Sequence, residues 1–70
     1  MKQVVSNMAG VVLEYLVNVG DTITVDQDVV TLEAMKMQIP IQSTVNGTVK
    51  TLKIKEGEFV DDGDVLIEME

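Results

Sequence analysis

The amino-acid sequence repeats itself, and this repeat constrains the fold more than any other feature of the chain. At an offset of 37 residues, the separation of Ser6 from Ser43, Gly10 falls on Gly47. The same offset matches further identical or similar residues: Val12 with Val49, Gly20 with Gly57, Glu33 with Glu70, Val17 with Ile54, Ile23 with Val60, Val29 with Leu66, Val30 with Ile67, and Leu32 with Met69. Such self-similarity indicates a repeated structural unit. We therefore expect two half-units, related by a pseudo-two-fold axis, to form one domain over residues 1–70, a chain length typical of one small domain.

Each half has the two-residue periodicity of β-strands. In residues 48–55, TVKTLKIK, the apolar Leu52 and Ile54 alternate with polar side chains. In the equivalent segment 14–19, Tyr15, Val17 and Val19 alternate with the residues between them. The alternation slips at Lys50, and again between Val12 and Tyr15, which predicts a bulge or bend in both halves. Residues 29–33, VVTLE, and the matching residues 65–70, VLIEME, are predicted to be strands that close the two half-units.

The turns are marked by residues that tolerate unusual backbone angles. Gly20 lies in the segment 18–21 and Gly57 in the segment 55–58, while residues 26–28 and 61–64 are acidic. Short strands separated by such turns, with no helical crossover, favour antiparallel pairing. The predicted fold is an all-β, flattened sandwich or barrel of two small sheets.

The junction between the two half-units contradicts the local preferences of its residues. Residues 31–39, TLEAMKMQI, are rich in helix formers, yet they stand between two short segments typical of strands. The second unit starts near Gln38, the counterpart of Met1, so the chain passes directly from a strand at 29–34 to a strand at 37–42. This leaves Met35 and Lys36 as a two-residue hairpin turn, at the end of the molecule opposite both termini.

A Met-Lys pair is a poor choice for such a turn. Two-residue hairpins favour Asn-Gly or Asp-Gly because the central positions need a positive φ. Each left-handed residue of another type costs about 1 to 2 kcal/mol. Elsewhere the chain places Gly, Asn or Asp at its turns. A local conflict of this kind is expected where function selected the residues, which makes Lys36 the candidate functional residue.

Composition excludes several classes of function. Twelve acidic residues against five lysines give a net charge of -7, which disfavours binding to nucleic acid or to anionic membranes and favours electropositive protein partners. The sequence contains no cysteine and no histidine, so a thiolate or imidazole metal site and a catalytic triad are excluded. It has neither a signal-peptide pattern nor an apolar run of about 18 residues. We expect a soluble, cytoplasmic protein.

The acidic turns raise the question of a calcium site. Asp61, Asp62 and Asp64 follow one another closely, and Asp26 and Asp28 stand at or beside the matching positions. They lack the twelve-residue spacing and the terminal bidentate glutamate of an EF-hand. We interpret them as solvated turn residues and predict no metal site.

A family resemblance rests on the residues around the junction. Glu33-Ala34-Met35-Lys36-Met37 is preceded by Gly20-Asp21 and followed by Asn46-Gly47-Thr48-Val49 and by residues 57–66. This pattern, over nearly the whole chain, resembles the biotinyl domain family, in particular the biotin carboxyl carrier modules and the small biotin/lipoyl attachment proteins. The resemblance implies the biotinyl/lipoyl hammerhead fold, a flattened antiparallel β-barrel of two quasi-symmetric four-stranded sheets.

The resemblance also implies a function. Lys36 would carry covalent biotin, attached by a biotin protein ligase that recognises Glu33, Ala34, Met35 and Met37. The domain would be a non-catalytic carrier, with biotin as its cofactor, moving carboxyl groups between a biotin carboxylase and a carboxyltransferase. Lysine suits this role because it offers an acylable nitrogen on a flexible stem.

Two alternatives remain open at the level of sequence. Lipoyl domains share the fold and the lysine, although their typical Asp-Lys-Ala pattern differs from Met35 and Met37 here. The other alternative is an unmodified structural or adaptor sandwich, in which the hairpin makes protein contacts. The chain also departs from the family pattern: Asp26 replaces a usual glycine, Met8-Ala9-Gly10 lacks a frequent proline, and residues 20–29 leave no room for the thumb-like insertion of some carriers.

Overall fold

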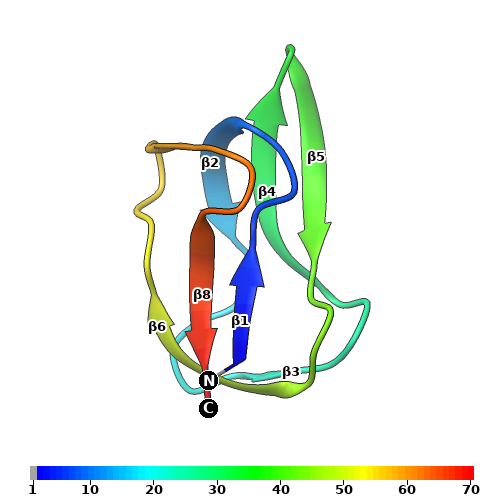
Figure 1. Ribbon diagram of the computed structural model, residues 1–70, viewed down its shortest axis with the longest axis vertical. Coiled ribbons are helices and arrows are strands. Elements are labelled where there is room, and N and C mark those ends of the chain that lie inside the picture. The colour runs from blue at the N-terminus through cyan, green and yellow to red at the C-terminus, as the bar shows by residue number, and fades with distance from the viewer. Residues whose placement is uncertain (1) are drawn as a thin grey trace.

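The chain forms two antiparallel sheets with no helix in the residues described. The computed structural model describes residues 2–70; Met1, the predicted counterpart of Gln38, lies outside them. The strands are β1 (Lys2–Val5), β2 (Gly10–Tyr15), β3 (Thr22–Ile23), β4 (Asp28–Ala34), β5 (Met37–Gln42), β6 (Gly47–Leu52), β7 (Phe59–Val60) and β8 (Val65–Met69). One sheet has the order β1-β8-β6-β3 and the other β5-β4-β2-β7. The predicted all-β fold of two four-stranded sheets is confirmed (Figure 1).

The two half-units make equivalent backbone hydrogen bonds to each other. The amide of Gly20 donates to the carbonyl of Val49 at 2.9 Å, and the amide of Gly57 donates to the carbonyl of Val12 at 2.7 Å. These four residues form two pairs at the offset found in the sequence, so each half reaches across to the other in the same way. These two equivalent hydrogen bonds show that the backbone follows the predicted pseudo-two-fold axis.

The core between the sheets is aliphatic, as the composition indicates. Leu32 and Ile67, one from each sheet, are fully buried. The other buried apolar side chains are Val4, Val12, Val17, Ile23, Val29, Val30, Ile41, Val49, Val60, Leu66 and Met69. The two aromatic residues lie outside this set, because Phe59 is exposed and Tyr15 is partly buried at the edge of the core.

The predicted bulges are present in both halves. The register between β2 and β4 shifts between Val12 and Glu14, and the register between β6 and β8 shifts between Val49 and Thr51. Lys50 is therefore the extra residue of the second bulge. An extra residue increases the local twist of a strand, which helps a small sheet to curve around its core.

The strands end earlier than the alternating pattern suggests. β2 ends at Tyr15 and β6 at Leu52, although the polar and apolar alternation continues for several residues. Beyond Tyr15 the chain turns, and the amide of Asn18 bonds to the carboxylate of Asp21 at 2.8 Å rather than to a strand. Val19 is consequently 62% exposed, so this part of the sequence pattern was wrong as a strand prediction.

The substitution of aspartate for glycine in the first half is accommodated by a left-handed backbone. Asp26 has a φ of 71°, and its counterpart Gly63 has a φ of 91°. Aspartate is among the few residues other than glycine that adopt this conformation routinely. The same turn therefore forms in both halves.

The hairpin of β4 and β5 projects from one end of the molecule, and both chain ends lie at the other (Figure 1). This confirms the predicted placement of the junction opposite the termini. The molecule measures 31 × 20 × 18 Å along its principal axes. Within residues 2–70 no helix is long and apolar enough to cross a membrane.

Candidate functional site

The candidate site is the turn that joins β4 to β5. Ala34 pairs with Met37, which leaves Met35 and Lys36 as the two central residues of the hairpin. Their φ angles are 53° and 64°. Positive φ at both central positions defines a type I′ turn, the type that normally carries Asn-Gly. The predicted two-residue turn and its strain are both confirmed.

The turn extends past the last residue pair that joins its hairpin to the neighbouring strand. The last pair between β2 and β4 joins Val11 to Glu33, so the hairpin extends further than its neighbouring strand. Just below, Gly10 packs tightly against the base of the hairpin, and a Cβ at this position would lie 2.8 Å from the carbonyl oxygen of Glu33. The turn is therefore held at a firm base and surrounded by solvent at its tip.

Lys36 differs from the other lysines in its position. It is exposed at the tip, and no side-chain hydrogen bond or ion pair to it is found within residues 2–70. The Nζ of Lys2 donates to the carbonyl of Asn46 at 2.6 Å, and the Nζ of Lys53 lies 3.9 Å from Glu68. Lys50 and Lys55 are exposed like Lys36, so what distinguishes Lys36 is its place in the projecting turn. The Lys36 amine is thus free to react or to be bound by a partner.

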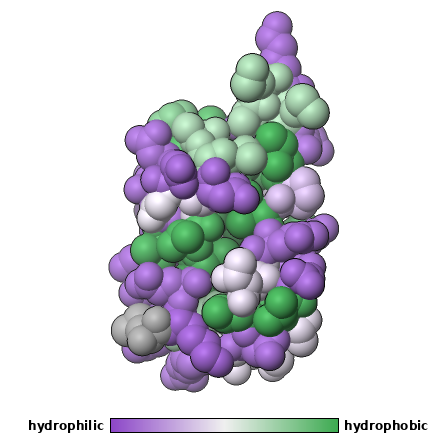
Figure 2. Space-filling view, turned by 45° about the vertical axis from the view of Figure 1, so that its right-hand side comes forward, coloured by the Kyte–Doolittle hydropathy of each residue, from purple (hydrophilic) through white to green (hydrophobic). Residues whose placement is uncertain are grey.

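Two methionines next to Lys36 form an apolar collar, a name we use for Met35 and Met37. Met35 is 94% exposed and Met37 is 63% exposed. Figure 2 shows the projection with a polar summit and apolar surface immediately below it. Thioether side chains are flexible and polarisable, which suits them to contact with a partner's apolar pocket.

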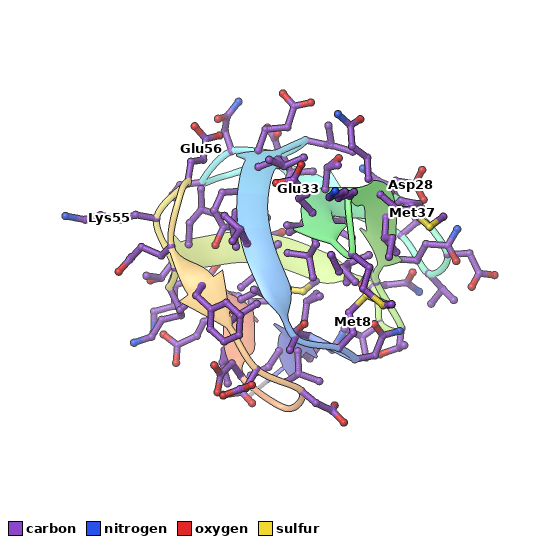
Figure 3. The ribbon with its side chains drawn as sticks, turned by 90° about the horizontal axis from the view of Figure 1, so that it is seen from above. Met8, Asp28, Glu33, Met37, Lys55 and Glu56 are labelled. Atoms are coloured by element: carbon purple, nitrogen blue, oxygen red, sulfur yellow. The ribbon has the colours of Figure 1, made fainter. Side chains whose placement is uncertain are left out.

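The sequence did not single out two further apolar residues near the hairpin. Met8 lies in the loop before Gly10 and is partly buried against the core. Figure 3, viewed from above, shows Met8 and Met37 on the hairpin side of the molecule, whereas Lys55 and Glu56 lie on the opposite side. The departure from the family pattern at residues 8–10 was the available signal for Met8, but the sequence alone did not show its proximity to the hairpin.

The second such residue is Phe59 on β7. Val11 pairs with Phe59 on one side and with Glu33 on the other, and Glu33 pairs with Gln38. Residues directly opposite in antiparallel strands share a face, so these four side chains form a row across the outer face of the sheet. Phe59 is 63% exposed, and its counterpart in the other half is Thr22. A phenylalanine at a position that is threonine in the other half was the signal in the sequence.

Aspartates of the acidic segments 26–28 and 61–64 accept internal hydrogen bonds. The carboxylate of Asp64 accepts a hydrogen bond from the amide of Asp61 at 2.9 Å, and the carboxylate of Asp28 accepts one from the side-chain amide of Gln42 at 3.1 Å. Across residues 2–70, no three acidic side chains converge in a way that could hold a metal ion. Asp26 and Asp62 lie in turns, as interpreted, whereas Asp28 is the first residue of β4 and not a turn residue.

A shallow pocket of about 310 Å³ lies away from the hairpin, next to Tyr15, Leu52 and Ile54. The hydroxyl of Tyr15 donates to the carbonyl of Ile54 at 2.6 Å and accepts from the amide of Ile54 at 3.2 Å. Burial raises the pKa of Tyr15 above its ordinary value of 10.0, against the hydrogen bond to Ile54, which lowers it. Tyr15 is accounted for by these structural bonds.

The fold and the strained lysine turn define a small two-sheet domain that displays one amine at its end. Residues 2–69 match the biotin/lipoyl family, described as biotin-requiring enzyme. The chain belongs to this family.

The relatives include both biotin and lipoyl proteins. The chain is 50% identical over 62 residues to a biotin/lipoyl attachment protein of Bacillus subtilis, covering 89% of this chain and 85% of that protein. It is 45% identical over 60 residues to a biotin carboxyl carrier protein of Streptococcus mutans, covering 86% of this chain and 46% of that one. It is also 39% identical over 66 residues to the dihydrolipoyllysine-residue acetyltransferase component of a pyruvate dehydrogenase complex from Pseudomonas aeruginosa, covering 94% of this chain and 12% of that protein.

The fold agrees with a solved carboxylase structure. The urea carboxylase of Kluyveromyces lactis contains a region that superposes with a TM-score of 0.84 at 28% identity, covering 93% of this chain and 6% of that chain. The resemblance to biotin/lipoyl attachment proteins, drawn from residues 33–37 and their surroundings, is confirmed. The comparisons include both cofactors, so they identify a biotin or lipoyl attachment domain.

Proposed function

We propose that the chain is a biotin carrier and that the Nζ of Lys36 is the atom that biotin protein ligase acylates. The observation that carries this proposal is the strained turn. Met35 and Lys36 both have positive φ, at positions where Asn and Gly would be more stable. Strain of this kind persists where the residues serve a purpose other than stability. An exposed amine at the summit of a projecting hairpin is such a purpose.

The residues present fit an attached acyl group. Lys36 is exposed and has no competing hydrogen bond within residues 2–70, so an amide can form without breaking an internal contact. Biotin, when attached, supplies a ring nitrogen that accepts and releases a carboxyl group. The chain's own contribution is to hold the attachment point on a stiff hairpin, where the flexible lysine stem gives reach. A tether of this kind acts by raising the effective concentration of the carried group at its partners.

The residues beside Lys36 would serve recognition. Met35 and Met37 present an apolar collar to a ligase pocket, and Glu33 places a carboxylate on the outer face of the same hairpin. Ala34 is small, and a Cβ built on Gly10 would lie 3.4 Å from the Cβ of Ala34. The motif therefore combines exposed side chains at Glu33, Met35 and Met37 with one small residue beside β2.

We favour biotin over lipoate because methionine flanks the lysine on both sides. The lipoyl alternative has its own support, since the similarity extends to a protein of the pyruvate dehydrogenase complex. A lipoyl carrier would use the same turn and the same amine. The two functions therefore differ in the ligase that recognises the hairpin.

The partners follow from the proposed reaction. Biotin carboxylase would load the carried group and carboxyltransferase would remove it, with the chain itself catalysing neither step. Relatives named as carboxylases or their components support this choice of partners. We propose that residues 1–70 act as one carrier domain in the cytoplasm.

Intact-mass spectrometry tests the proposal. The purified chain is incubated separately with biotin protein ligase and biotin, and with a lipoate ligase and lipoate, each with ATP. We expect a mass gain of one biotinoyl group, lost in Lys36→Arg and retained in Lys55→Arg. Lys55 is a matched control because it is also an exposed lysine in a turn. A lipoyl gain alone would support the alternative cofactor, and no gain with either ligase would refute both carrier functions and favour an adaptor.

A further inference from the structure

The sulfur atoms of the chain are distributed unevenly with respect to solvent. The sequence has five methionines and no cysteine, so thioethers are its sole sulfur groups. Met35 is 94% exposed and Met37 63%, Met8 is partly buried, and Met69 is fully buried. Oxidation of methionine to its sulfoxide follows accessibility. Within residues 2–70, the two thioethers most open to oxidants are the two that flank Lys36.

We propose that Met35 is a hydroperoxide-sensitive modification site whose oxidation blocks acylation of Lys36. This inference rests on the proposed function, because it assumes that a ligase binds the collar. In the reaction the thioether sulfur attacks one oxygen of a hydroperoxide, a sulfur–oxygen bond forms and the oxygen–oxygen bond breaks. The sulfur is oxidised to the sulfoxide, and the hydroperoxide is reduced to water or an alcohol as its proton moves to the leaving oxygen.

The sulfoxide changes the surface that a ligase meets. It converts a flexible apolar side chain into a polar one with a strong acceptor oxygen. A ligase pocket shaped for a thioether would have to bury that oxygen without a partner. Met35 is adjacent to Lys36 in the same turn, so a displaced Met35 also moves the amine away from the acyl donor.

The fold itself should be indifferent to the same oxidation. Met35 is almost entirely in solvent and so contributes no packing that a sulfoxide could remove. Met69, whose oxidation would disrupt the core, is shielded by burial. The arrangement therefore couples an oxidant to the acylation step and spares the stability of the domain. A methionine sulfoxide reductase would reverse the effect.

The test oxidises the carrier and measures its acylation. The chain is treated with hydrogen peroxide, the peroxide is removed with catalase, and biotin protein ligase is then added. Peptide mapping should show that Met35 gains oxygen before Met8 and Met69. The rate of biotinylation should fall by about tenfold, the factor that corresponds to about 1.4 kcal/mol, and should return after treatment with methionine sulfoxide reductase. The melting temperature of the oxidised chain should equal that of the untreated chain.

Variants separate the collar from other sites. Each variant is compared with its own untreated sample, so that any change in basal rate cancels. Met35→Leu should lose most of the sensitivity to peroxide, whereas Met8→Leu, the matched control, should keep it. An unchanged rate after oxidation of Met35, or equal sensitivity of Met35→Leu, would overturn the inference while leaving the carrier function intact. A failure of the untreated chain to be acylated would instead refute the function on which the inference rests.

Discussion

At the scale of single residues, backbone preference and side-chain chemistry oppose each other in the turn. Met35 and Lys36 each adopt a left-handed conformation that costs about 1 to 2 kcal/mol for residues of their type. Asp26, the third non-glycine residue with positive φ in residues 2–70, has a side chain suited to that conformation. The turn at 35–36 is thus the place where this small domain gives up stability for a displayed amine and its collar.

Replacing Met35 by asparagine should reveal this cost. Asparagine tolerates the left-handed conformation and is favoured in type I′ turns. Met35→Asn should therefore raise the free energy of unfolding by about 1 kcal/mol, measured by denaturant unfolding. The same variant should be acylated more slowly, because one half of the collar is gone.

Met37→Asn is the control for this experiment. Met37 is also an exposed methionine, but it lies in β5 and not among the residues with positive φ. Asparagine is disfavoured in strands, so this variant should be no more stable than the native chain. A gain in stability at position 37, or none at position 35, would contradict the assignment of strain to the turn.

At the scale of elements, the hairpin depends on close contact with β2. Gly10 begins β2, and a Cβ there would lie 2.8 Å from the carbonyl oxygen of Glu33 in β4. Gly20 has open space around it, but its φ of 95° disfavours any side chain. The two glycines are required for different reasons, one for packing and the other for backbone conformation.

Alanine at these positions should separate the two reasons. Gly10→Ala should lower the free energy of unfolding by about 1 to 3 kcal/mol, because a backbone oxygen must move. Gly20→Ala should lower it by about 1 to 2 kcal/mol. Hydrogen exchange should distinguish them: amides of β4 and β5 exchange faster in Gly10→Ala and remain protected in Gly20→Ala. Equal protection of the hairpin in both variants would show that Gly10 does not support it.

The sequence predicted the elements well where the alignment of the two halves supplied the evidence. The bulges at Val12 and Val49 and the turn at 35–36 followed from the aligned halves together. The ends of β2 and β6 were not predictable, since the alternating pattern continues into loops whose amides bond to side chains such as Asp21. Phe59 and Met8 were missed at the site because their proximity to the hairpin arises from strand order, which periodicity does not report.

At the scale of the whole molecule, Tyr15 links the two sheets. It lies on β2 of one sheet, and its hydroxyl also lies 3.1 Å from the carbonyl of Leu66 on β8 of the other. The hydroxyl serves the backbone of Ile54 as donor and acceptor as well. Its counterpart in the second half is Leu52, so this bridge occurs on one side of the pseudo-two-fold alone.

Stability at alkaline pH should report on this bridge. Because burial raises the pKa of Tyr15 in the folded state, the protonated phenol is favoured by folding. The stability that it contributes is complete below pH 10.0, the ordinary pKa, and is lost as pH rises through the raised value. The chain has one tyrosine and no tryptophan, so the absorbance of the tyrosinate follows this group directly. We expect its midpoint above 10.0 in the folded chain and at about 10.0 in denaturant.

Tyr15→Phe is the matching variant. It should lower the free energy of unfolding by about 1 kcal/mol at neutral pH, because the amide of Ile54 loses its acceptor. It should also flatten the decline in stability above pH 10.0. A native midpoint at or below the ordinary value would contradict the buried, hydrogen-bonded position of the hydroxyl.

The position of the acyl group on the chain tests the central claim most directly. The protein is produced together with biotin protein ligase, digested, and its peptides are fragmented in a mass spectrometer. All the biotinoyl groups should lie on Lys36, with Lys2, Lys50, Lys53 and Lys55 unmodified. Acylation at another lysine, or spread over several, would contradict the proposal that the strained turn presents the reactive amine.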